Sequence, residues 1–325
     1  MKNPSFRAVL VVLALTAFNA ATAAEEAYPS KPIKLIVPFP PGSTPDIVAR
    51  ILGQKLTEAW HQPVIVENKT GAGGNIGTAE AAKAAPDGYT LVIGINGPIA
   101  VNKALYDNLP YDPEKDLKPI SLLFVGAQIL TVHPSVPASN LKEFVEYVRK
   151  NPGKLAYGSV GSGSGSHLTM ELLKSQAKLD LVHVPYRGFP QVVEDLIPGR
   201  IQATFAIIPA VLPHINSGKL KGLAVTSAAR TPLAPGIATV AEQGFPHFEA
   251  TAWAGLFAPA GVSKEILDKL ATETQRVMRL SEVRSRMSAQ GFEVVGSTPE
   301  EFGRFIRSET EKWTRVVKAV GAKPE

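Results

Sequence analysis

The sequence predicts an α/β protein of two lobes, each built on a sheet, joined by two crossover segments. Strand and helix patterns alternate near the N-terminus and again in the middle of the chain, which is typical of parallel sheets covered by helices. Two long extended segments, 121–132 and 248–257, bracket the middle set. We therefore expect lobe one at 29–124 plus 254–325 and lobe two at 125–253.

The first set of elements lies near the N-terminus. Residues 33–37 form a short, apolar, β-branched run, as expected for a buried parallel strand. Apolar residues then recur at helical spacing up to Trp60, and a further strand, helix and strand follow. The predicted strands of this set are 33–37, 64–66 and 91–93, and the predicted helices are 44–60 and 76–85.

The second set fills the middle of the chain, and helices follow it. Thr298, Pro299 and Glu301 supply a capping residue, a first-turn proline and an acid three positions after the cap, which predicts a helix start. The predicted strands are 155–158, 182–184, 203–208 and 223–225, and the predicted helices are 141–150, 167–177, 191–197, 264–280 and one that begins at 298.

The N-terminal segment has the pattern of a secretory signal peptide. Lys2 and Arg7 precede an apolar run at 8–18, and the small residues that end at Ala23 match a cleavage site. The apolar run is too short to span a bilayer as an anchor. We therefore expect residues 1–23 to be removed and the rest of the chain to be exported.

The composition excludes several classes of protein. The 325 residues contain no cysteine, which rules out disulfides, thiolate catalysis and metal sites built on cysteine. The net charge is only +5 and the basic residues are scattered, so we expect no nucleic-acid partner. The six histidines show no metal-ligand spacing. We expect neither a metal nor another cofactor.

A stiff, polar loop leads from the first predicted strand into the first predicted helix. Residues 37–44 read VPFPPGST, and Pro45 follows. Thr44 fits the helix cap and Pro45 the first helical position, where a missing N–H costs nothing. Such a start directs free amides and the positive end of the helix dipole towards a ligand, which predicts an anion site. A rigid connection with an ordinary cap is the alternative.

Two glycine-rich loops have the same design, each after a strand and before a helix. The loop KTGAGGNIG at 69–77 falls short of the dinucleotide-binding pattern because Ile76 stands where that pattern has glycine. The loop YGSVGSGSGSHL at 157–168 has neither the lysine of a phosphate-binding loop nor the serine-centred motif of a hydrolase. We predict that the three loops converge on a small anion in the cleft between the lobes. A flexible surface loop is the alternative for 157–168.

These motifs, in this order, resemble the Bug family of periplasmic substrate-binding receptors, which are related to the receptors of tripartite tricarboxylate transporters. The match runs from about Tyr28 to the C-terminus. The segments that carry it are YPSKPIKLIVPFPPGSTPDIVAR, VENKTGAGGNIGTAEAAKAAPDGYTL, YGSVGSGSGSHLTMELL, VHVPYRG and LAVTSAARTPLAPGIATVAEQGFPHFEATAWAGLFAPAGV. The resemblance implies a bilobed type II periplasmic-binding-protein fold, a periplasmic monomer and no enzymatic activity. It also implies delivery of a small carboxylate to a membrane permease of the tripartite tricarboxylate type or to a sensor protein.

The resemblance also implies where the ligand binds. Backbone amides and ordered waters at the two loops of lobe one would hold a carboxylate, and lobe two would close over it. Carried over by motif, the ligand contacts are Pro41, Gly42, Ser43, Thr44, Ala72, Gly73, Gly74, Asn75, Ser159, Gly161, Ser164, His167, Phe205 and Ala206.

Three positions depart from the pattern of the family. Ser43 stands where the family usually has a second glycine, Pro45 where it often has threonine, and Ala206 where many members have aspartate. Loss of that carboxylate removes a partner for an ammonium group. We therefore predict a mono- or dicarboxylate ligand without an amine, aromatic ones such as terephthalate included. An amino-acid or citrate-type receptor is the alternative.

Several single side chains have two interpretations each. Arg187 is a candidate partner for a second carboxylate, with an exposed arginine as the alternative. His167 fits a ligand donor or a packing and capping residue, and Asp46 fits compensation of the helix dipole better than a ligand contact. Core or hinge packing, with stacking on a ligand as the alternative, is expected of Phe39, Phe205 and Trp253.

Two other functions are compatible with the sequence. One is a secreted serine hydrolase that uses a serine of 159–166 with His167 or His183, although neighbours in sequence rarely form a catalytic triad. The other is a ligand-dependent partner of a sensor kinase, which would share the carboxylate chemistry of a transport receptor.

Overall fold

The computed structural model describes residues 28–321, so the predicted signal peptide lies outside the described residues. The strands form a ten-stranded sheet in the order β2-β1-β3-β9-β4-β7-β5-β6, with β8 and β10 also paired to β4. The strands are β1 Ile33–Val37, β2 Val64–Asn68, β3 Thr90–Ile95, β4 Leu117–Val132, β5 Ala156–Ser159, β6 Val182–Pro185, β7 Ala203–Ile207, β8 Lys221–Val225, β9 Thr251–Pro259 and β10 Glu293–Val294.

Helices pack against this sheet in both lobes. The α-helices are α2 Thr44–Trp60, α3 Asn75–Ala82, α4 Asn102–Leu105, α5 Leu141–Lys150, α6 Gly165–Ala177, α7 Phe189–Leu196, α8 Ile208–Asn216, α9 Lys264–Arg279, α10 Ser281–Ala289 and α11 Pro299–Val320. Two short turns of other helical types are η1 Ala72–Gly74 and η2 Gly97–Val101. None of these described helices is both long and apolar enough to cross a membrane.

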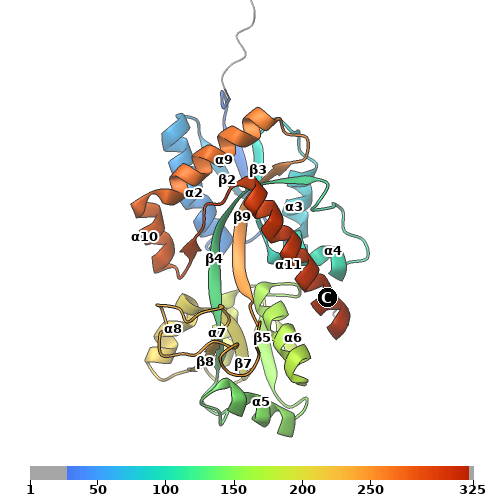
Figure 1. The fold of residues 1–325 in the computed structure, drawn as a ribbon, viewed down its shortest axis with the longest axis vertical. Coiled ribbons are helices and arrows are strands. Elements are labelled where there is room, and N and C mark those ends of the chain that lie inside the picture. Colours follow the sequence, from blue (N-terminus) through green and yellow to red (C-terminus); the bar gives the residue numbers. More distant parts are fainter. Residues whose placement is uncertain (1–27, 322–325) are drawn as a thin grey trace, which may run out of the picture.

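Two strands run between the lobes, as Figure 1 shows. β4 pairs with β9 as far as Ala127 and with β7 and β8 from Gln128 onward, so one continuous strand belongs to both lobes. β9 returns the chain to lobe one from Thr251. The predicted architecture of two sheet-containing lobes joined by two crossovers is confirmed. The predicted boundaries at 124/125 and 253/254 stay a prediction.

Lobe one follows the predicted parallel pattern. β1 pairs in parallel with β2 and β3, and all of its residues except Lys34 are buried, as is typical of a parallel strand covered by helices. α2 turns Val48, Ile51, Leu52 and Leu56 towards this sheet, where they join one hydrophobic cluster with the apolar residues of β1 and β9. The carboxyl ends of β1 and β2 therefore lead into their loops at the same edge of the sheet.

Lobe two repeats the plan with shorter strands. β5 pairs in parallel with β6 and β7, and α5 buries Leu141, Phe144, Val145 and Val148. Asn140 caps α5, and its side chain accepts a hydrogen bond from the amide of Glu143. The loop after β5 is thereby carried on a buried strand.

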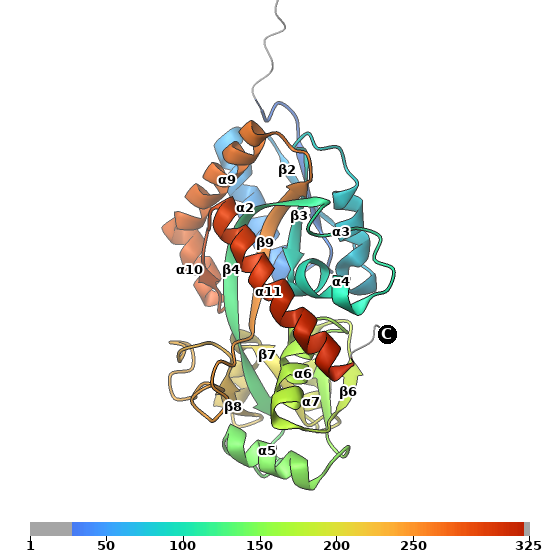
Figure 2. The ribbon, with the colours of Figure 1, turned by 45° about the vertical axis from the view of Figure 1, so that its right-hand side comes forward.

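Helix α11 contacts both lobes. It packs on η2, α4 and β4 in lobe one and on α6 in lobe two, and Figure 2 shows it crossing the junction. Its start has the predicted capping box: Thr298 accepts from the amide of Glu301, and the Glu301 side chain accepts from the amide of Thr298. This part of the sequence prediction is confirmed.

A buried carboxylate fixes α11 to the crossover. Glu309 accepts hydrogen bonds from the indole nitrogens of Trp253 and Trp313, each at 2.9 Å, and from Nδ2 of Asn96 at 3.3 Å. Lys312 forms an ion pair with the same carboxylate. Trp253 is therefore a core residue at the hinge, and its indole N–H is already bonded.

Candidate functional site

The N-cap of α2 lies one residue earlier than predicted. Ser43, not Thr44, is the N-cap, and Thr44 and Pro45 are the first two helical residues. The cap makes no side-chain hydrogen bond, and Oγ of Ser43 is buried with no partner among the described residues. Thr44 therefore opens the first turn, whose amides have no acceptor within the helix.

Asp46 holds this loop together from inside the helix. Its carboxylate accepts from the amide of Gly42 at 2.9 Å, from Nε of Arg50 at 3.0 Å and from Nδ2 of Asn68 at 2.9 Å. Burial alone would raise the pKa of Asp46, but the hydrogen bonds from Arg50, Gly42 and Asn68 outweigh it and keep the pKa below its usual value. Asp46 is thus engaged within the protein, as expected of a structural residue.

The second loop consists of successive residues with positive φ. Gly71, Ala72, Gly73 and Gly74 have φ of 129°, 46°, 61° and 95°. The amides of Gly74 and Asn75 close the turn on the carbonyls of Gly71 and Ala72. Ala72 and Gly73 are exposed residues, and their amides take no part in these bonds, which leaves them as candidate backbone donors.

Phe39 ties the two loops of lobe one together. A Cβ atom on Gly74 would lie 2.8 Å from Cζ of Phe39 and 2.9 Å from Cγ of Pro98, so only glycine fits under the ring. The carbonyl of Phe39 accepts from Asn68, which also bonds Asp46. Phe39 is half-buried and packs within lobe one, which leaves Pro41 and Gly42 exposed beside it.

The third loop, 159–166, lies at the start of α6 in lobe two. Ser164 caps α6 and accepts from the amide of His167 at 3.4 Å. The amide of Ser164 donates to the carbonyl of Gly161, and that of Gly163 donates to Nδ1 of His167 at 3.1 Å. The loop is therefore an ordered turn, because hydrogen bonds from neighbouring side chains and backbone hold its amides.

Two histidines support this loop from within lobe two. The rings of His167 and His183 lie with centroids 4.3 Å apart, and Nε2 of His183 is 2.6 Å from Oγ of Ser159. That Oγ accepts from the amide of Gly161 at 3.1 Å. Burial, then the charge of His183, lowers the pKa of His167 to about 4. Ser159 and His167, both predicted to contact the ligand, here hold the backbone of the loop.

The Ser159–His183 pair resembles part of a hydrolase site only in its distance. Ser159 exposes none of its surface, so a substrate has no access to its hydroxyl. The sequence suggested His183 only as a partner of a hydrolase serine, and its support of the loop through Ser159 was not predicted.

Loops of the two lobes meet where the lobes face one another. A Cβ atom on Gly73 would lie 3.7 Å from the carbonyl oxygen of Ser162, and one on Gly97 would lie 3.1 Å from the carbonyl oxygen of Gly163. The structure thus brings the glycine-rich loops 71–74 and 161–164 together, and the convergence of all three loops on an anion stays a prediction.

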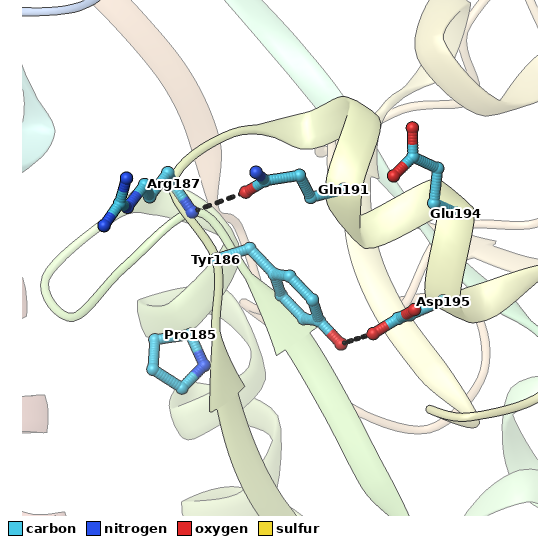
Figure 3. A pocket seen from close by; sticks show the side chains of 6 residues that line it. All are labelled: Pro185, Tyr186, Arg187, Gln191, Glu194 and Asp195. Carbon is cyan, nitrogen blue, oxygen red and sulfur yellow. Dashed lines mark hydrogen bonds between the residues drawn. The ribbon is translucent and has the colours of Figure 1, made fainter.

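Arg187 lies at a polar pocket of about 440 Å³ on lobe two. Its lining residues are Pro185, Tyr186, Arg187, Gln191, Glu194 and Asp195. The amide of Arg187 donates to Oε1 of Gln191, and the guanidinium extends away from the two acids (Figure 3). Burial and a hydrogen bond to Asp195 raise the pKa of Tyr186 to about 12. Arg187 is exposed, and no acid among residues 28–321 pairs with it.

Phe205 and Ala206 lie in β7, where neither exposes any surface. Phe205 packs in the main core and Ala206 packs with Ile129 and Ile208, so neither presents a side chain to solvent in this structure. Within residues 28–321 no group of three or more His, Asp or Glu side chains is suited to holding a metal ion.

Comparison with known proteins identifies the family. A sequence model described as the tripartite tricarboxylate transporter family receptor matches residues 48–322. BugT of Bordetella pertussis is 36% identical over 317 residues, which cover 97% of each chain.

Two solved structures from Rhodopseudomonas palustris share the fold. Rpa4515 with adipate has a TM-score of 0.84 and 32% identity, covering 92% of this chain and 100% of that one. MatC with bound malate has a TM-score of 0.81 and 32% identity, covering 89% of this chain and 100% of that one. The resemblance to the Bug proteins and the bilobed binding-protein fold are confirmed. The chain therefore belongs to the family of tripartite tricarboxylate transporter receptors.

Proposed function

We propose that this chain is a periplasmic receptor that captures a small carboxylate without an amine and delivers it to a tripartite tricarboxylate-type permease. The observation that carries the proposal is that loop 71–74 of lobe one meets loop 161–164 of lobe two, while Phe39, in the loop before α2, packs on Gly74. Residues 1–23 act as its signal peptide, cleaved after Ala23, and the exported protein works as a monomer. The alternative recipient is a sensor kinase.

The magnitude of the binding free energy requires several donors. One helix N-terminus contributes at most about 2 kcal/mol, whereas micromolar affinity requires about 8 kcal/mol. Charge-assisted hydrogen bonds contribute about 1.5–3 kcal/mol each, so several amides from more than one loop are needed. The amides of Ala72 and Gly73, with the first turn of α2, supply such a set.

The chemistry of the ligand is supported by two observations. Adipate and malate, which are present in the two similar structures, are dicarboxylates without an amine. Arg187 is exposed and offers a cation for a second carboxylate. Ser159 is buried, so its hydroxyl is not accessible as a nucleophile, and we propose binding without catalysis.

A thermal-shift screen of residues 24–325 tests the proposal. Mono-, di- and tricarboxylates, both aliphatic and aromatic, are compared with amino acids. A ligand at a hundredfold excess over its dissociation constant stabilises the folded state by about 2.7 kcal/mol, which raises the melting temperature by several degrees. Hits confined to amine-free carboxylates support the proposal. Hits on amino acids contradict its ligand class, and hydrolysis of ester substrates contradicts the binding role.

The site itself is tested by titration calorimetry with the best ligand of the screen. Arg187→Ala and Ser43→Gly are each expected to weaken binding of a dicarboxylate about tenfold, the effect of one charge-assisted hydrogen bond. Arg284→Ala removes an exposed arginine from α10 and serves as the control. Unchanged affinity in both site variants would exclude these side chains from the site.

A further inference from the structure

We propose that Asn102 and Gly163 set the balance between the open and closed cleft, a role that rests on the proposed function and deepens it. Asn102, in lobe one, is a positioning residue on which the backbone of Gly163 docks when the lobes meet. Docking buries an amide oxygen of Asn102 that has no donor. The closed form without ligand is therefore disfavoured until a bound carboxylate contributes its own contacts.

In lobe one, buried hydrogen bonds hold the side chain of Asn102 in place. Nδ2 of Asn102 donates to Oδ1 of Asn75 at 2.5 Å, and the hydroxyl of Tyr111 bonds the same oxygen at 3.0 Å and the carbonyl of Pro98 at 2.8 Å. All three side chains of this cluster are buried, and Asn102 exposes 1% of its surface. Because Nδ2 of Asn102 is used on Asn75, its Oδ1 faces the other way.

The oxygen of Asn102 faces a glycine of the opposite lobe. A Cβ atom on Gly163 would lie 2.9 Å from Oδ1 of Asn102 and 3.3 Å from a methyl group of Leu105. The carbonyl of Gly163 in turn lies where a Cβ atom on Gly97 would be 3.1 Å away. The two lobes thus touch here through backbone, and a side chain at position 163 would keep them apart.

No donor compensates the buried oxygen. Oδ1 of Asn102 has no hydrogen-bond partner among the described residues, and the amide of Gly163 is already bonded to His167. An acceptor that loses water without gaining a donor is unfavourable. Moving loop 161–164 away would return the oxygen to water, so this cost falls on the closed form alone.

Substitutions at these two contacting residues should shift the ratio of closed to open protein in opposite directions. Asn102→Ala removes the unpaired oxygen and favours closure, by about fivefold or more in the ratio of closed to open protein. Gly163→Ala introduces a clash and favours opening. In the double variant the clash is relieved, so its closed fraction lies well above that of Gly163→Ala alone.

Double electron–electron resonance, which measures the distance between two spin labels, tests this directly. The chain contains no cysteine, so labels can be attached at introduced cysteines alone. Spin labels at K83C on the end of α3 and Q176C on α6 report the separation of the lobes from exposed positions. The protein is measured without ligand and with saturating adipate. Wild type without ligand is expected to be mostly at the longer distance.

Matched variants separate docking from general strain. Gly218→Ala carries the same backbone cost, since Gly218 has φ of 74° against 78° for Gly163, but a Cβ atom there meets nothing within 4 Å. Tyr111→Phe loosens the cluster and leaves the Asn102 oxygen in place. Neither is expected to raise the closed fraction, and thermal unfolding of each variant confirms that it folds.

Each outcome decides the proposal. Opposite shifts for Asn102→Ala and Gly163→Ala, with rescue in the double variant, support it even if no carboxylate binds, in which case only the proposed function fails. Shifts in one direction, or none, overturn it even if adipate binds. A wild type already at the short distance without ligand overturns it as well. Where adipate binds, Asn102→Ala is expected to bind it more tightly than wild type.

Discussion

The imidazole rings of His167 and His183 lie against one another with centroids 4.3 Å apart, although they come from α6 and β6. His167 accepts from the amide of Gly163, and His183 reaches the amide of Gly161 through Ser159. Both rings therefore hold donors of the same loop.

Stability should fall as the pH falls from about 6.5 to about 4. His183 on β6, Tyr157 on β5, and Glu171 and Lys174 on α6 face His167, and burial with the charge of His183 lowers its pKa to about 4. The unfolded chain then binds the proton more readily than the folded one, so acid favours unfolding across that window. The full loss of unfolding free energy across this pH window is about 3 kcal/mol.

Urea unfolding at several pH values measures this effect. His167→Gln should show a flatter dependence of unfolding free energy on pH than wild type, whatever its absolute stability. His214→Gln, at a half-buried position on α8, should keep the wild-type slope. Equal slopes in all three proteins would show that His167 is not the group responsible.

Asp46→Asn should loosen the first loop. The amide that replaces the carboxylate points an N–H group at the donors of Gly42, Arg50 or Asn68. We expect a loss of about 1–3 kcal/mol in unfolding free energy and weaker adipate binding. The control is Glu58→Gln, at an exposed ion pair of the same helix, where little change is expected. Similar midpoints for the two variants would refute this role.

Glu309→Gln should weaken the hinge. The new amide leaves at least one of the donors from Trp253, Trp313 and Asn96 without a carboxylate, which costs about 2–3 kcal/mol. Tryptophan emission follows the same change, because two of the three indoles of the chain bond this group. Glu311 lies two residues after Glu309 on α11 and is exposed. Glu311→Gln should therefore leave both readouts as in wild type.

Gly74→Ala should impair the second loop. Its Cβ atom would overlap Phe39 and Pro98, at a residue with φ of 95°. Adipate affinity should fall at least tenfold, and the melting temperature should fall too. Gly244→Ala is the matched comparison, since φ is 102° there and a Cβ atom meets nothing within 4 Å. If both variants bind adipate alike, the packing of Phe39 on Gly74 does not shape the site.

Local patterns explain what could be predicted from the sequence. Periodicity and strand–helix alternation depend on neighbours in the chain, and so the two lobes and most elements were expected. The capping box of Thr298 and Glu301 lies within one turn and was predicted in full. The N-cap of α2 was placed one residue late, at Thr44 instead of Ser43, because both residue types suit a cap.

Contacts between distant residues could not be predicted in this way. Asn96 and Glu309 are 213 positions apart, and nothing in either neighbourhood indicates the other. The same holds for Asn102 against Gly163. Helix α8 was not expected either, because it contains Pro213, a residue that commonly ends helices.

The position of β9 in the sheet has a consequence for the order in which the chain folds. β9 lies between β3 and β4, so the sheet of lobe one has a gap at its centre until Thr251–Pro259 is in place. The strands that flank this gap are made more than a hundred residues earlier. Pairing across such a separation is slow, and the edges of β3 and β4 stay unpaired meanwhile. Lobe two, by contrast, is a nearly continuous stretch of chain that can form first and bring the end of β9 back to its neighbours.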